Sequence, residues 1–583
     1  MFDFTILLDE VSKTENCNQL NDEELKSLDY DFFKNGIVWQ ILTEITLDGK
    51  CTDITLYISF PNNFPFSFPK IFIERSSYEP LKYIPHINYD LSICIFDEGT
   101  NPLMPIANFH ELLELMLSKA KKIITNASDE QYKRDEFLNE FKAYWELDYS
   151  KEDSILNSGF HSINSENASP IKGIGFTNKL FYGYEYFLSN DDADLERIKN
   201  IATLNGHKYQ EVSVIIIDNP FNTPPYDTTF EKSLEYIQYD KDNFQEFKKI
   251  CKSNDFNSVI VLFKNIKNSV IEYYGWTYKD VLTLMRKHGG YRNANSKFVH
   301  LTAPYNKHKL ISRLSFDNIS LDRLQKRTTG YIEAQKSIAI SGLGSVGSHL
   351  IYFLRNLPIN KFHLIDNDSL SPDNIKRHYL GLSYSKHKKV DALKNELNSL
   401  NPLYTIEVRD DSVNNLILNE PAFLNECDFH IVAIGNTNVE NFILENIKNG
   451  TLTKPTILFW VEPFLASGQM LFVLPNDAQK ILDLISKDNY PYQVLSNSIN
   501  QIDKTYLIEG SCQSGYFPYS ATNLTYFLSS IFPFLKLHLL SENNTTSKIY
   551  SWIGDKNLIK EKLLVTSEFG NANESFQLII NEA

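Results

Sequence analysis

A glycine-rich loop between an apolar run and a helix-like run constrains the fold of this chain more than any other feature. The apolar run is Lys336–Ile340, the loop is Gly342–Gly347, and Ser348–Leu354 follows with helical spacing. Glycines are needed in such a turn because a side chain would block the tight bend and the approach of a phosphate to the backbone N–H groups. A second apolar run, Phe362–Ile365, ends at Asp366, at the distance where an acidic residue meets a ribose hydroxyl. This order predicts a Rossmann-like nucleotide-binding domain.

The residues after the second apolar run favour ATP over a dinucleotide. They follow the pattern D-x-D…N-x-x-R, with a lysine at the head of the next helix-like run. A hydride-transfer enzyme needs no such polar cluster beside the phosphates. An enzyme that directs attack on an α-phosphate does need one, because charge builds up on that phosphate and on the departing pyrophosphate. The residues of this pattern are Asp366, Asp368, Asn374, Arg377 and Lys389.

This stretch resembles the adenylation domain shared by ubiquitin-activating enzymes and the bacterial ThiF/MoeB family. The resemblance covers 335–438 well and the rest of the C-terminal region loosely. It implies ATP and Mg²⁺ as cofactors and a homodimer through the adenylation domains. By this resemblance three glycines cradle phosphate, one aspartate binds ribose, and three polar residues hold the phosphates. In that order, these residues are Gly342, Gly344 and Gly347, then Asp366, then Asn374, Arg377 and Lys389.

The chain departs from the family pattern where the magnesium ligand is expected. In the family, the strand near Ile431 leads to an aspartate that holds magnesium, and here Gly435 stands at that position. Asp368 or a water is therefore expected to substitute as the metal ligand. Family members also supply an arginine from upstream, often across a dimer. The candidates for this role are Arg323 and Arg327.

Two of the six cysteines have sequence contexts that suit thioester chemistry, in which an exposed thiolate stores an activated acyl group. Cys512 lies among small residues, EGSCQSG, downstream of the nucleotide loop, and resembles the transfer cysteine of activating enzymes. Cys94 follows a proline-rich run and a His-x-Asn segment, which resembles ubiquitin-conjugating enzymes. His86 and Asn88 belong to that segment. The resemblance gives Asn88 the role of steadying the oxyanion, although Ile87 replaces the usual proline.

The other four cysteines have weaker claims to a function. Cys51 and Cys427 lie in strand-like or helix-end apolar contexts and are expected to pack in the core. Cys17 and Cys251 have polar or charged neighbours but no activating base nearby in sequence. Because no C-x-x-C pair occurs, the cysteines argue against a structural zinc site and against a disulfide framework.

At 583 residues the chain is too long for one core and is expected to fold as an α/β multidomain protein. The predicted parts are an α+β conjugating-like domain at 1–150, a middle α/β domain at 151–320 and a ThiF-type adenylation domain at 321–583. The predicted elements include a hairpin at Asp48-Gly49, a helix at 110–126, a linker at 148–170, strands at 212–217 and 258–263, a helix at 244–251, and a buried helix pair within 524–540, interrupted by Pro533.

The formal net charge of −16 argues against a nucleic-acid partner. We expect no membrane span, because the most apolar stretch, 524–540, contains a proline, a lysine and a histidine. The N-terminus has no basic stretch followed by an apolar core, so the default expectation is a cytoplasmic protein.

Together the N-terminal and C-terminal parts resemble the fused conjugating–activating enzymes found beside bacterial anti-phage cyclic-oligonucleotide (CBASS) systems. The resemblance implies that the C-terminal tail of a cyclic-oligonucleotide synthase is activated and joined to target proteins, with lysine amines as the acceptors. Three alternatives stay open: a sulfur-carrier activating enzyme of the ThiF/MoeB type, a non-enzymatic scaffold that binds nucleotide, and a nicotinamide oxidoreductase.

Overall fold

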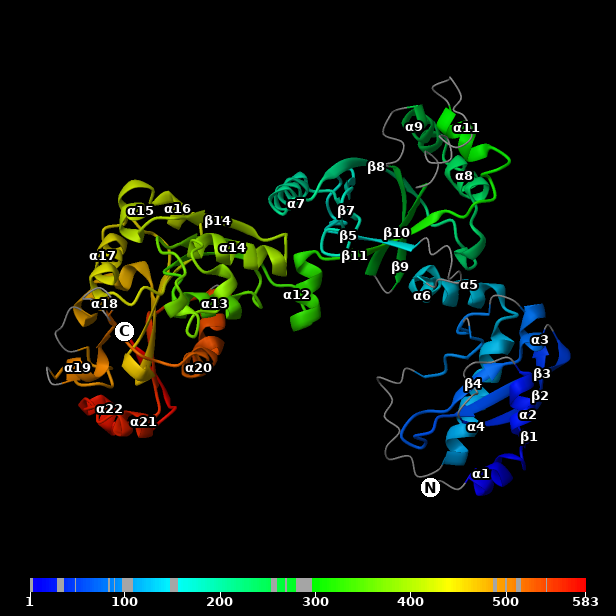
Figure 1. The fold of residues 1–583 in the computed structure, drawn as a ribbon, viewed down its shortest axis with the longest axis horizontal. Helices are drawn as coiled ribbons and strands as arrows, with labels where there is room; N and C mark the ends of the chain where they lie inside the picture. The colour runs from blue at the N-terminus through cyan, green and yellow to red at the C-terminus, as the bar shows by residue number, and fades with distance from the viewer. Residues whose placement is uncertain are drawn as a thin grey trace. The chain divides into compact units, whose positions relative to one another are not determined.

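The computed structural model describes residues 4–28, 36–47, 49–81, 84–88, 90–96, 109–146, 156–252, 259–267, 270–278, 296–485, 490–498, 501–509, 515–541 and 543–583. These residues form two compact units (Figure 1). The first unit comprises 1–161, 169–190 and 207–317, and the second comprises 162–168, 191–206 and 318–583. The chain therefore passes from one unit to the other several times before the second unit continues to the C-terminus.

The first unit begins with a four-stranded antiparallel sheet. Its strands, in spatial order, are β1 (Asn16–Gln19), β2 (Ile37–Leu47), β3 (Lys50–Phe60) and β4 (Lys70–Ile73). The predicted hairpin is confirmed by the register, in which Leu47 pairs with Lys50, and Gly49 between them has a φ of +75°. The accompanying helices are α1 (Phe4–Val11), α2 (Asp22–Ser27), α3 (Arg75–Tyr78), α4 (Phe109–Asn126), α5 (Glu130–Asn139) and α6 (Phe141–Glu146).

The α4 helix buries one face of this sheet and confirms the helix predicted at 110–126. Its buried side chains recur every three or four residues, as expected of an amphipathic helix, and join the strand residues in one apolar core. Members of that core from the helix are Leu113, Leu117, Ala120 and Ile124.

The rest of the first unit contains a closed seven-stranded barrel in the order β10-β11-β5-β7-β6-β8-β9. The β8–β9 and β5–β7 pairs are parallel, and antiparallel pairing of β9 with β10 closes the barrel. The strands are β5 (Leu156–His161), β6 (Lys172–Phe176), β7 (Tyr186–Ser189), β8 (Tyr209–Ile217), β9 (Val259–Lys267), β10 (Val270–Thr277) and β11 (Ser312–Asn318). Helices α8 (Phe230–Gln238), α9 (Lys241–Lys252) and α11 (Ser296–Thr302) accompany them.

The barrel confirms the strand predicted at 212–217, the strand predicted at 258–263 over its described residues 259–263, and the helix predicted at 244–251. It corrects the linker predicted at 148–170. Leu156–His161 is strand β5 of the barrel, and Phe160 and His161 are buried. The polar residues that suggested a linker lie on both sides of β5, a short strand whose last residues are buried. Tertiary packing, which a local composition signal does not contain, decides the conformation there.

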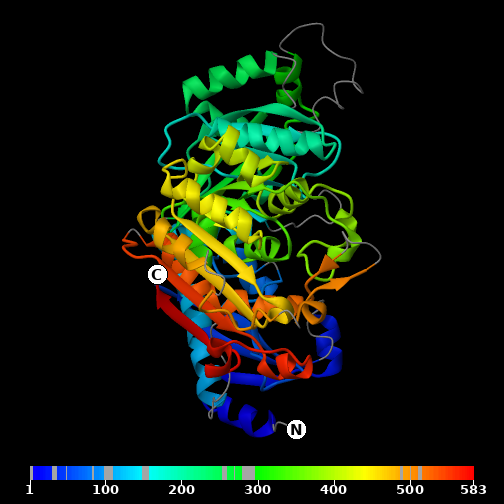
Figure 2. The ribbon, with the colours of Figure 1, turned by 90° about the vertical axis from the view of Figure 1, so that its left-hand side faces the viewer.

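The second unit is built on an eight-stranded sheet in the order β14-β13-β12-β15-β16-β17-β20-β21. The run from β14 to β16 is parallel, and the remaining strands are antiparallel. In chain order the strands are β12 (Lys336–Ser341), β13 (Ile359–Ile365), β14 (Thr405–Arg409), β15 (Phe429–Val432), β16 (Thr456–Val461), β17 (Ser467–Val473), β20 (Lys548–Ile553) and β21 (Leu578–Glu582). Figure 2 shows the C-terminal strand β21, in red, at one edge.

Helices cover both faces of this sheet (Figure 1). One face carries α13 (Ser345–Leu354), α14 (Lys389–Leu400) and α20 (Ala521–Leu540). The other carries α15 (Val413–Asn419), α16 (Ala422–Asn425), α17 (Thr437–Lys448) and α18 (Ala478–Ile485). Burial on both faces explains why the central strand β12 reads as a continuous apolar run. The predicted Rossmann-like arrangement is confirmed.

The edge strand β14 of the sheet has a partner from far upstream in the chain. Helix α7 (Asp192–Leu204) belongs to the second unit, and Arg197 donates from Nη2 to the hydroxyl of Thr405, the first residue of β14, at 2.9 Å. Asp194 holds the same guanidinium with a 2.7 Å ion pair. Residues outside the C-terminal region therefore complete the second unit.

The residues predicted as a helix pair form one helix, α20, with Pro533 inside it. Proline removes one helical hydrogen bond, at a cost of roughly 3 kcal/mol. Leu524, Ile531 and Leu535 are buried in the core on both sides of the proline, and each such side chain stabilises the fold by about 1.5–3 kcal/mol. Burial thus outweighs the lost bond. None of the described helices is long and apolar enough to cross a membrane.

Candidate functional site: a glycine loop, a cavity and an exposed cysteine

The glycine loop lies at the carboxyl end of β12, and its three glycines have different roles. Gly342 has a φ of +88°, and a Cβ there would lie 2.7 Å from the carbonyl oxygen of Ala433. A Cβ on Gly347 would collide with the carbonyl oxygen of Gly342, whereas one on Gly344 would meet nothing within 4 Å. The fold therefore requires Gly342 and Gly347. Gly344 leaves open space at the N-cap of α13, where backbone N–H groups can face an anion.

Asp366, directly after β13, connects the loop to two other predicted site residues. Its carboxylate accepts from the N–H of Leu343 at 2.6 Å and from the N–H of Asp368 at 2.8 Å. Nζ of Lys389, the first residue of α14, lies 3.8 Å from Asp366 and 2.8 Å from the Asp368 carboxylate. Burial raises the pKa of Asp366, and the nearby Lys389 opposes that effect. The structure thus brings these three residues together beside the glycine loop.

Arg377 links this cluster to a later part of the chain. Its Nη1 donates to the carbonyl of Phe517 at 3.0 Å, and its guanidinium lies 5.3 Å from the ring centroid of Tyr519. Both contacts fall shortly after Cys512 in sequence, so the phosphate-site motif and the segment downstream of that cysteine meet at Arg377. Asn374 is hydrogen-bonded within its own turn.

A buried histidine under the loop was missed by the sequence analysis. His378 accepts from the N–H of Leu380 at Nδ1 and therefore donates from Nε2 to the carbonyl of Leu343, at 2.9 Å. Burial lowers the pKa of His378 to about 4, so the ring is neutral and supports the loop from below. Its place directly after Arg377 was the one available signal.

A cavity of about 510 Å³ opens at the carboxyl ends of β15 and β16, beside Gly435. In parallel α/β sheets ligands bind at the carboxyl ends of the strands, and the glycine loop lies at the carboxyl end of β12. Aromatic side chains line it, among them Trp460, Tyr490 and Phe517. A partly apolar cavity of this size is large enough for a short peptide segment.

Two glutamates with raised pKa values also line the cavity. Glu440 is only 4% exposed, and its Oε1 has no hydrogen-bond partner among the residues that the structure describes. Burial raises the pKa of Glu440 to about 7 and that of Glu462 to about 7. Glu462 accepts from the N–H of Val494 at 3.0 Å. Glu440 lies in the first turn of α17, five residues after Gly435, the position where the family pattern has its aspartate. Its sequence context gave no signal for a site.

The two candidate arginines lie at the amino ends of the strands, opposite to the ends that carry the glycine loop. Arg323 and Arg327 belong to helix α12 (Leu321–Thr329), which borders a small cavity lined by Gln335 and Ile359, at the amino ends of β12 and β13. Arg323 donates to the carbonyl of Asn318 at 2.6 Å. The length of β12 separates the amino ends of the strands from the glycine loop by roughly 20 Å, at about 3.3 Å per residue. Within one chain, neither arginine reaches the loop.

In the first unit, Cys94 lies on a tight turn and its side chain is exposed. The N–H of Cys94 donates to the carbonyl of His86 at 2.8 Å, and the N–H of Asn88 donates to the carbonyl of Ser92 at 2.8 Å. The side-chain amide of Asn88 donates to the Ser92 hydroxyl at 3.0 Å. The cysteine and the asparagine of the His-x-Asn segment are thus held on one turn.

His86 fastens this turn to helices α5 and α6. Its Nε2 lies 2.9 Å from a Glu136 oxygen and its Nδ1 lies 2.7 Å from a Glu140 oxygen. Its backbone N–H donates to the Tyr144 hydroxyl at 3.0 Å. The bond to Glu140 raises the pKa of His86, and burial works in the opposite direction. Because both ring nitrogens contact carboxylates of the helical segment, His86 positions the turn that carries Cys94 against these helices.

Cys512 lies outside the described residues, so its surroundings stay a prediction. Cys427 is buried in the core as expected. The expectation for Cys51 was wrong: it is exposed near the hairpin turn, and its thiol donates to Glu44 at 3.0 Å. The strands extend past the buried part of the sheet there, so both faces contact solvent. Burial raises the pKa of Cys17, Cys251 and Cys427 to about 12, which argues against their use as nucleophiles.

Comparison with protein-family models gives two matches. Residues 317–540 match the ThiF family, and residues 33–154 match Prokaryotic E2 family B. The chain is therefore a multidomain α/β protein with an E2-like domain near its N-terminus and a ThiF domain towards its C-terminus. No curated protein matches the sequence.

Among solved structures, the similar chains include MccB of E. coli and a second protein, PaaA. PaaA is 15% identical with a TM-score of 0.29, over 42% of this chain and 64% of PaaA. MccB with MccA-N7isoASN is 13% identical with a TM-score of 0.27, over 45% of this chain and 66% of MccB. MccB with ATP is 14% identical with a TM-score of 0.26, over 42% and 63%. This chain spans slightly less than two thirds of each.

Proposed function

We propose that this chain activates the C-terminus of a protein with ATP and transfers it, through two of its own cysteines, to an amine. A carboxylate oxygen of the substrate attacks the α-phosphate and pyrophosphate leaves. The Cys512 thiolate then attacks the acyl carbonyl and AMP leaves. The Cys94 thiolate displaces Cys512 from the thioester. A target amine, by resemblance that of a lysine, attacks the new thioester, loses a proton and releases Cys94 as an isopeptide bond forms.

The observation that carries this proposal is the convergence at Arg377. The arginine of the predicted phosphate-binding motif bonds to the carbonyl of Phe517, shortly after Cys512 in sequence. A nucleophile that discharges an acyl-adenylate has to approach the α-phosphate, so a link between these two segments suits the reaction. A nicotinamide oxidoreductase has no use for it.

The residues beside the loop suit magnesium as well as phosphate. Asp368 presents a carboxylate that is 66% exposed, next to the ammonium of Lys389, and hard cations prefer oxygen ligands. We propose that Asp368 holds magnesium, which when bound would neutralise charge on the phosphates, while Lys389 and the N–H groups near Gly344 hold the phosphate oxygens.

The cavity beside Gly435 is the proposed place for the end of the substrate tail. It shares the carboxyl edge of the sheet with the glycine loop, and its aromatic walls accommodate an extended peptide. By resemblance to the fused anti-phage enzymes, the tail is that of a cyclic-oligonucleotide synthase, and the enzyme works as a homodimer. In a homodimer Arg323 or Arg327 would act on the second copy, because neither reaches the loop of its own chain.

Adenylation is tested by pyrophosphate exchange into ATP in the presence of candidate tails from proteins of neighbouring genes. Asp366→Asn and Arg377→Ala are expected to reduce exchange at least about tenfold, equivalent to about 1.4 kcal/mol. Lys376→Ala, which removes a neighbouring exposed cation, is the matched control and should keep exchange. If all three variants exchanged pyrophosphate at the wild-type rate, the activation step would be removed from the proposal.

The relay is tested by adducts on non-reducing gels. Wild type with ATP and a substrate should form thioesters at two positions, which reducing agent removes. Cys512→Ala should form none, and Cys94→Ala should form one. A Cys512→Ala variant that still charges Cys94 would contradict the order of transfer. The match of 33–154 to an E2 family favours this relay over sulfur-carrier activation, for which Cys94 would be dispensable.

A further inference from the structure

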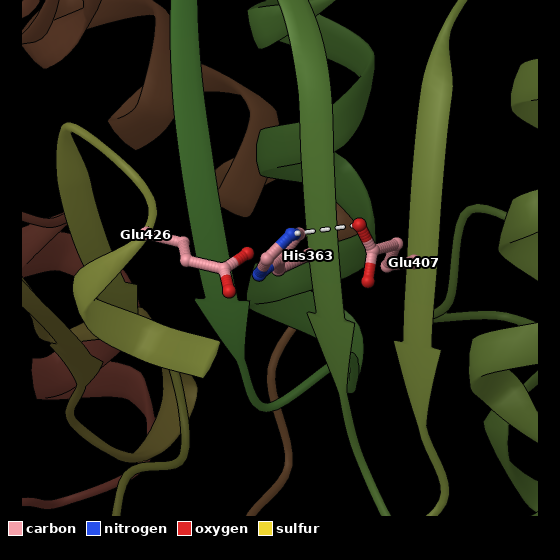
Figure 3. Close-up of side chains that lie close together, drawn as sticks. All are labelled: His363, Glu407 and Glu426. Carbon is pink, nitrogen blue, oxygen red and sulfur yellow. Dashed lines mark ion pairs between the residues drawn. The ribbon is translucent and has the colours of Figure 1, made fainter. Parts of the chain in front are cut away.

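A cluster of one histidine and two glutamates lies in the second unit, on the face of the sheet covered by α15 and α16. His363 comes from β13, Glu407 comes from β14, and Glu426 follows α16. One ligand atom from each lies within 4.8 Å of the other two. Figure 3 shows the imidazole of His363 between the two carboxylates.

The histidine is the fixed member of this cluster. Its side chain is fully buried, and its ring stacks on Phe423 with 4.0 Å between centroids. Nδ1 lies 2.7 Å from the carbonyl of Phe423. A carbonyl only accepts, so the proton is on Nδ1 and the Nε2 lone pair is left over in the neutral ring. Metal-binding histidines typically donate their second nitrogen to a carbonyl or carboxylate in this way.

Nε2 of His363 points into the cluster without a hydrogen-bond partner among the described residues. The nearest carboxylate oxygen, from Glu407, lies at 3.6 Å, which is too long for a hydrogen bond. A buried lone pair beside two carboxylates is an arrangement that a cation stabilises. An imidazole nitrogen with two carboxylate oxygens is a donor set for a divalent transition metal of the zinc type.

Lys361 already contacts both carboxylates. Its Nζ lies 3.2 Å from Glu426 and 3.8 Å from Glu407. Arg409, which is paired with Glu420, also acts electrostatically on both carboxylates, but neither cation is a hydrogen-bond partner of Nε2. The lysine side chain is flexible and part-exposed, so it can move to solvent when a stronger cation arrives.

We propose that His363, Glu407 and Glu426 form a binding site for a divalent transition metal that ties β13, β14 and the end of α16 together. Zinc bonds of about 2.0–2.2 Å require the ligand atoms to approach by roughly 1 Å. His363 stays in place, and the glutamate side chains, 44% and 55% exposed, rotate towards it. The site uses no cysteine and is separate from the nucleotide loop, so it does not depend on the proposed function.

The test uses the full chain without nucleotide, with excess Mg²⁺ present to fill sites for hard cations. Zn²⁺ binding is measured by equilibrium dialysis, and Co²⁺ is used as a spectroscopic probe of the ligands. Wild type should bind one more equivalent of Zn²⁺ than Glu407→Gln/Glu426→Gln. It should also show a Co²⁺ absorption spectrum and a Zn²⁺-dependent rise in melting temperature that this double variant lacks. Glu445→Gln, which removes another lysine-paired glutamate, is the matched control and should behave as wild type.

Lys361→Met separates a metal site from an ordinary ion-pair cluster. At a metal site the lysine competes with the ion, so this variant should bind Zn²⁺ severalfold more tightly than wild type. In an ion-pair cluster, the same substitution removes the favourable partner and leaves Zn²⁺ affinity unchanged. The proposal is overturned if Lys361→Met does not tighten binding, or if the double variant keeps the stoichiometry of wild type.

Discussion

Gly344 and Gly347 are three residues apart in the same loop, yet the structure gives them different functions. An added Cβ at Gly347 collides with backbone, whereas one at Gly344 enters open space. Gly347→Ala is therefore expected to destabilise the second unit by about 1–3 kcal/mol, as overpacking does. Gly344→Ala should keep the melting temperature and weaken ATP binding, because its methyl group occupies the space that a phosphate needs. Thermal denaturation and nucleotide titration of both variants distinguish the two effects.

Glu440 gives a pH dependence whose sign follows from its burial. Its pKa rises from 4.5 in the unfolded chain to about 7 in the fold, so the folded protein binds the extra proton between these values. Stability contributed by this group is thus highest below about pH 4.5, falls as the pH rises to about 7, and is constant above that.

Glu440→Gln removes the ionisation while it keeps the shape of the side chain. Near pH 8 this variant should be more stable than wild type by about 1–3 kcal/mol, and at pH 5 the two should be nearly equal. Urea denaturation at both pH values measures the difference. Glu445→Gln, on the exposed side of the same helix, controls for the loss of charge. An equal difference at the two pH values would show that the Glu440 carboxyl is not the titrating group.

At the scale of elements, helices α5 and α6 hold the turn that carries Cys94 through His86. The stability that this contact contributes is lost both at low pH and at high pH. The pKa of Glu140 is lowered, so its part is present above about 4.5 and is lost as the pH falls through the folded pKa. The pKa of His86 is raised, so its part is present below about 6.5 and is lost as the pH rises through the folded pKa. The contact is strongest between these values.

His86→Gln should therefore lower the stability of the first unit most near pH 5.5, by about 1–2 kcal/mol, and least near pH 9. The loosened turn should also slow transfer from Cys94 to an amine without changing pyrophosphate exchange. Melting curves over this pH range and single-turnover transfer assays check both effects. Unchanged transfer would mean that the turn keeps its shape without the histidine.

Much of the second unit could be predicted from sequence because its signals are local. The β12 strand, the glycine loop and Asp366 follow one another along the chain, and Asp366 accepts a hydrogen bond from Leu343 of the loop. Sequence reasoning missed Glu440 and Trp460, because a cavity between strand ends brings together residues without a shared motif. Pro533 misled it, since buried leucines on both sides keep α20 continuous. Leu156–His161 was hidden because a barrel strand needs partners from distant parts of the sequence.

At the scale of the whole molecule, the predicted chemistry is divided between the units. Cys94 belongs to the first unit, and the glycine loop belongs to the second. Cys94→Ala should therefore leave pyrophosphate exchange within about twofold of wild type, because an exposed thiol contributes little to packing, and should abolish transfer to amines. Exchange assays and conjugate gels on the same preparation measure both. A large loss of exchange would indicate that the units depend on each other for adenylation.

The contact between Arg197 and Thr405 has a consequence for the modularity of the gene. A shortened gene that starts at residue 318 would encode the whole eight-stranded sheet and leave out helix α7. The polypeptide would then lack the hydrogen bond that Arg197 donates to Thr405, the first residue of the edge strand β14. A fragment that keeps the second unit whole therefore has to carry 191–206 as well as 318–583, and a cut at residue 318 divides a folded body rather than a linker between two bodies.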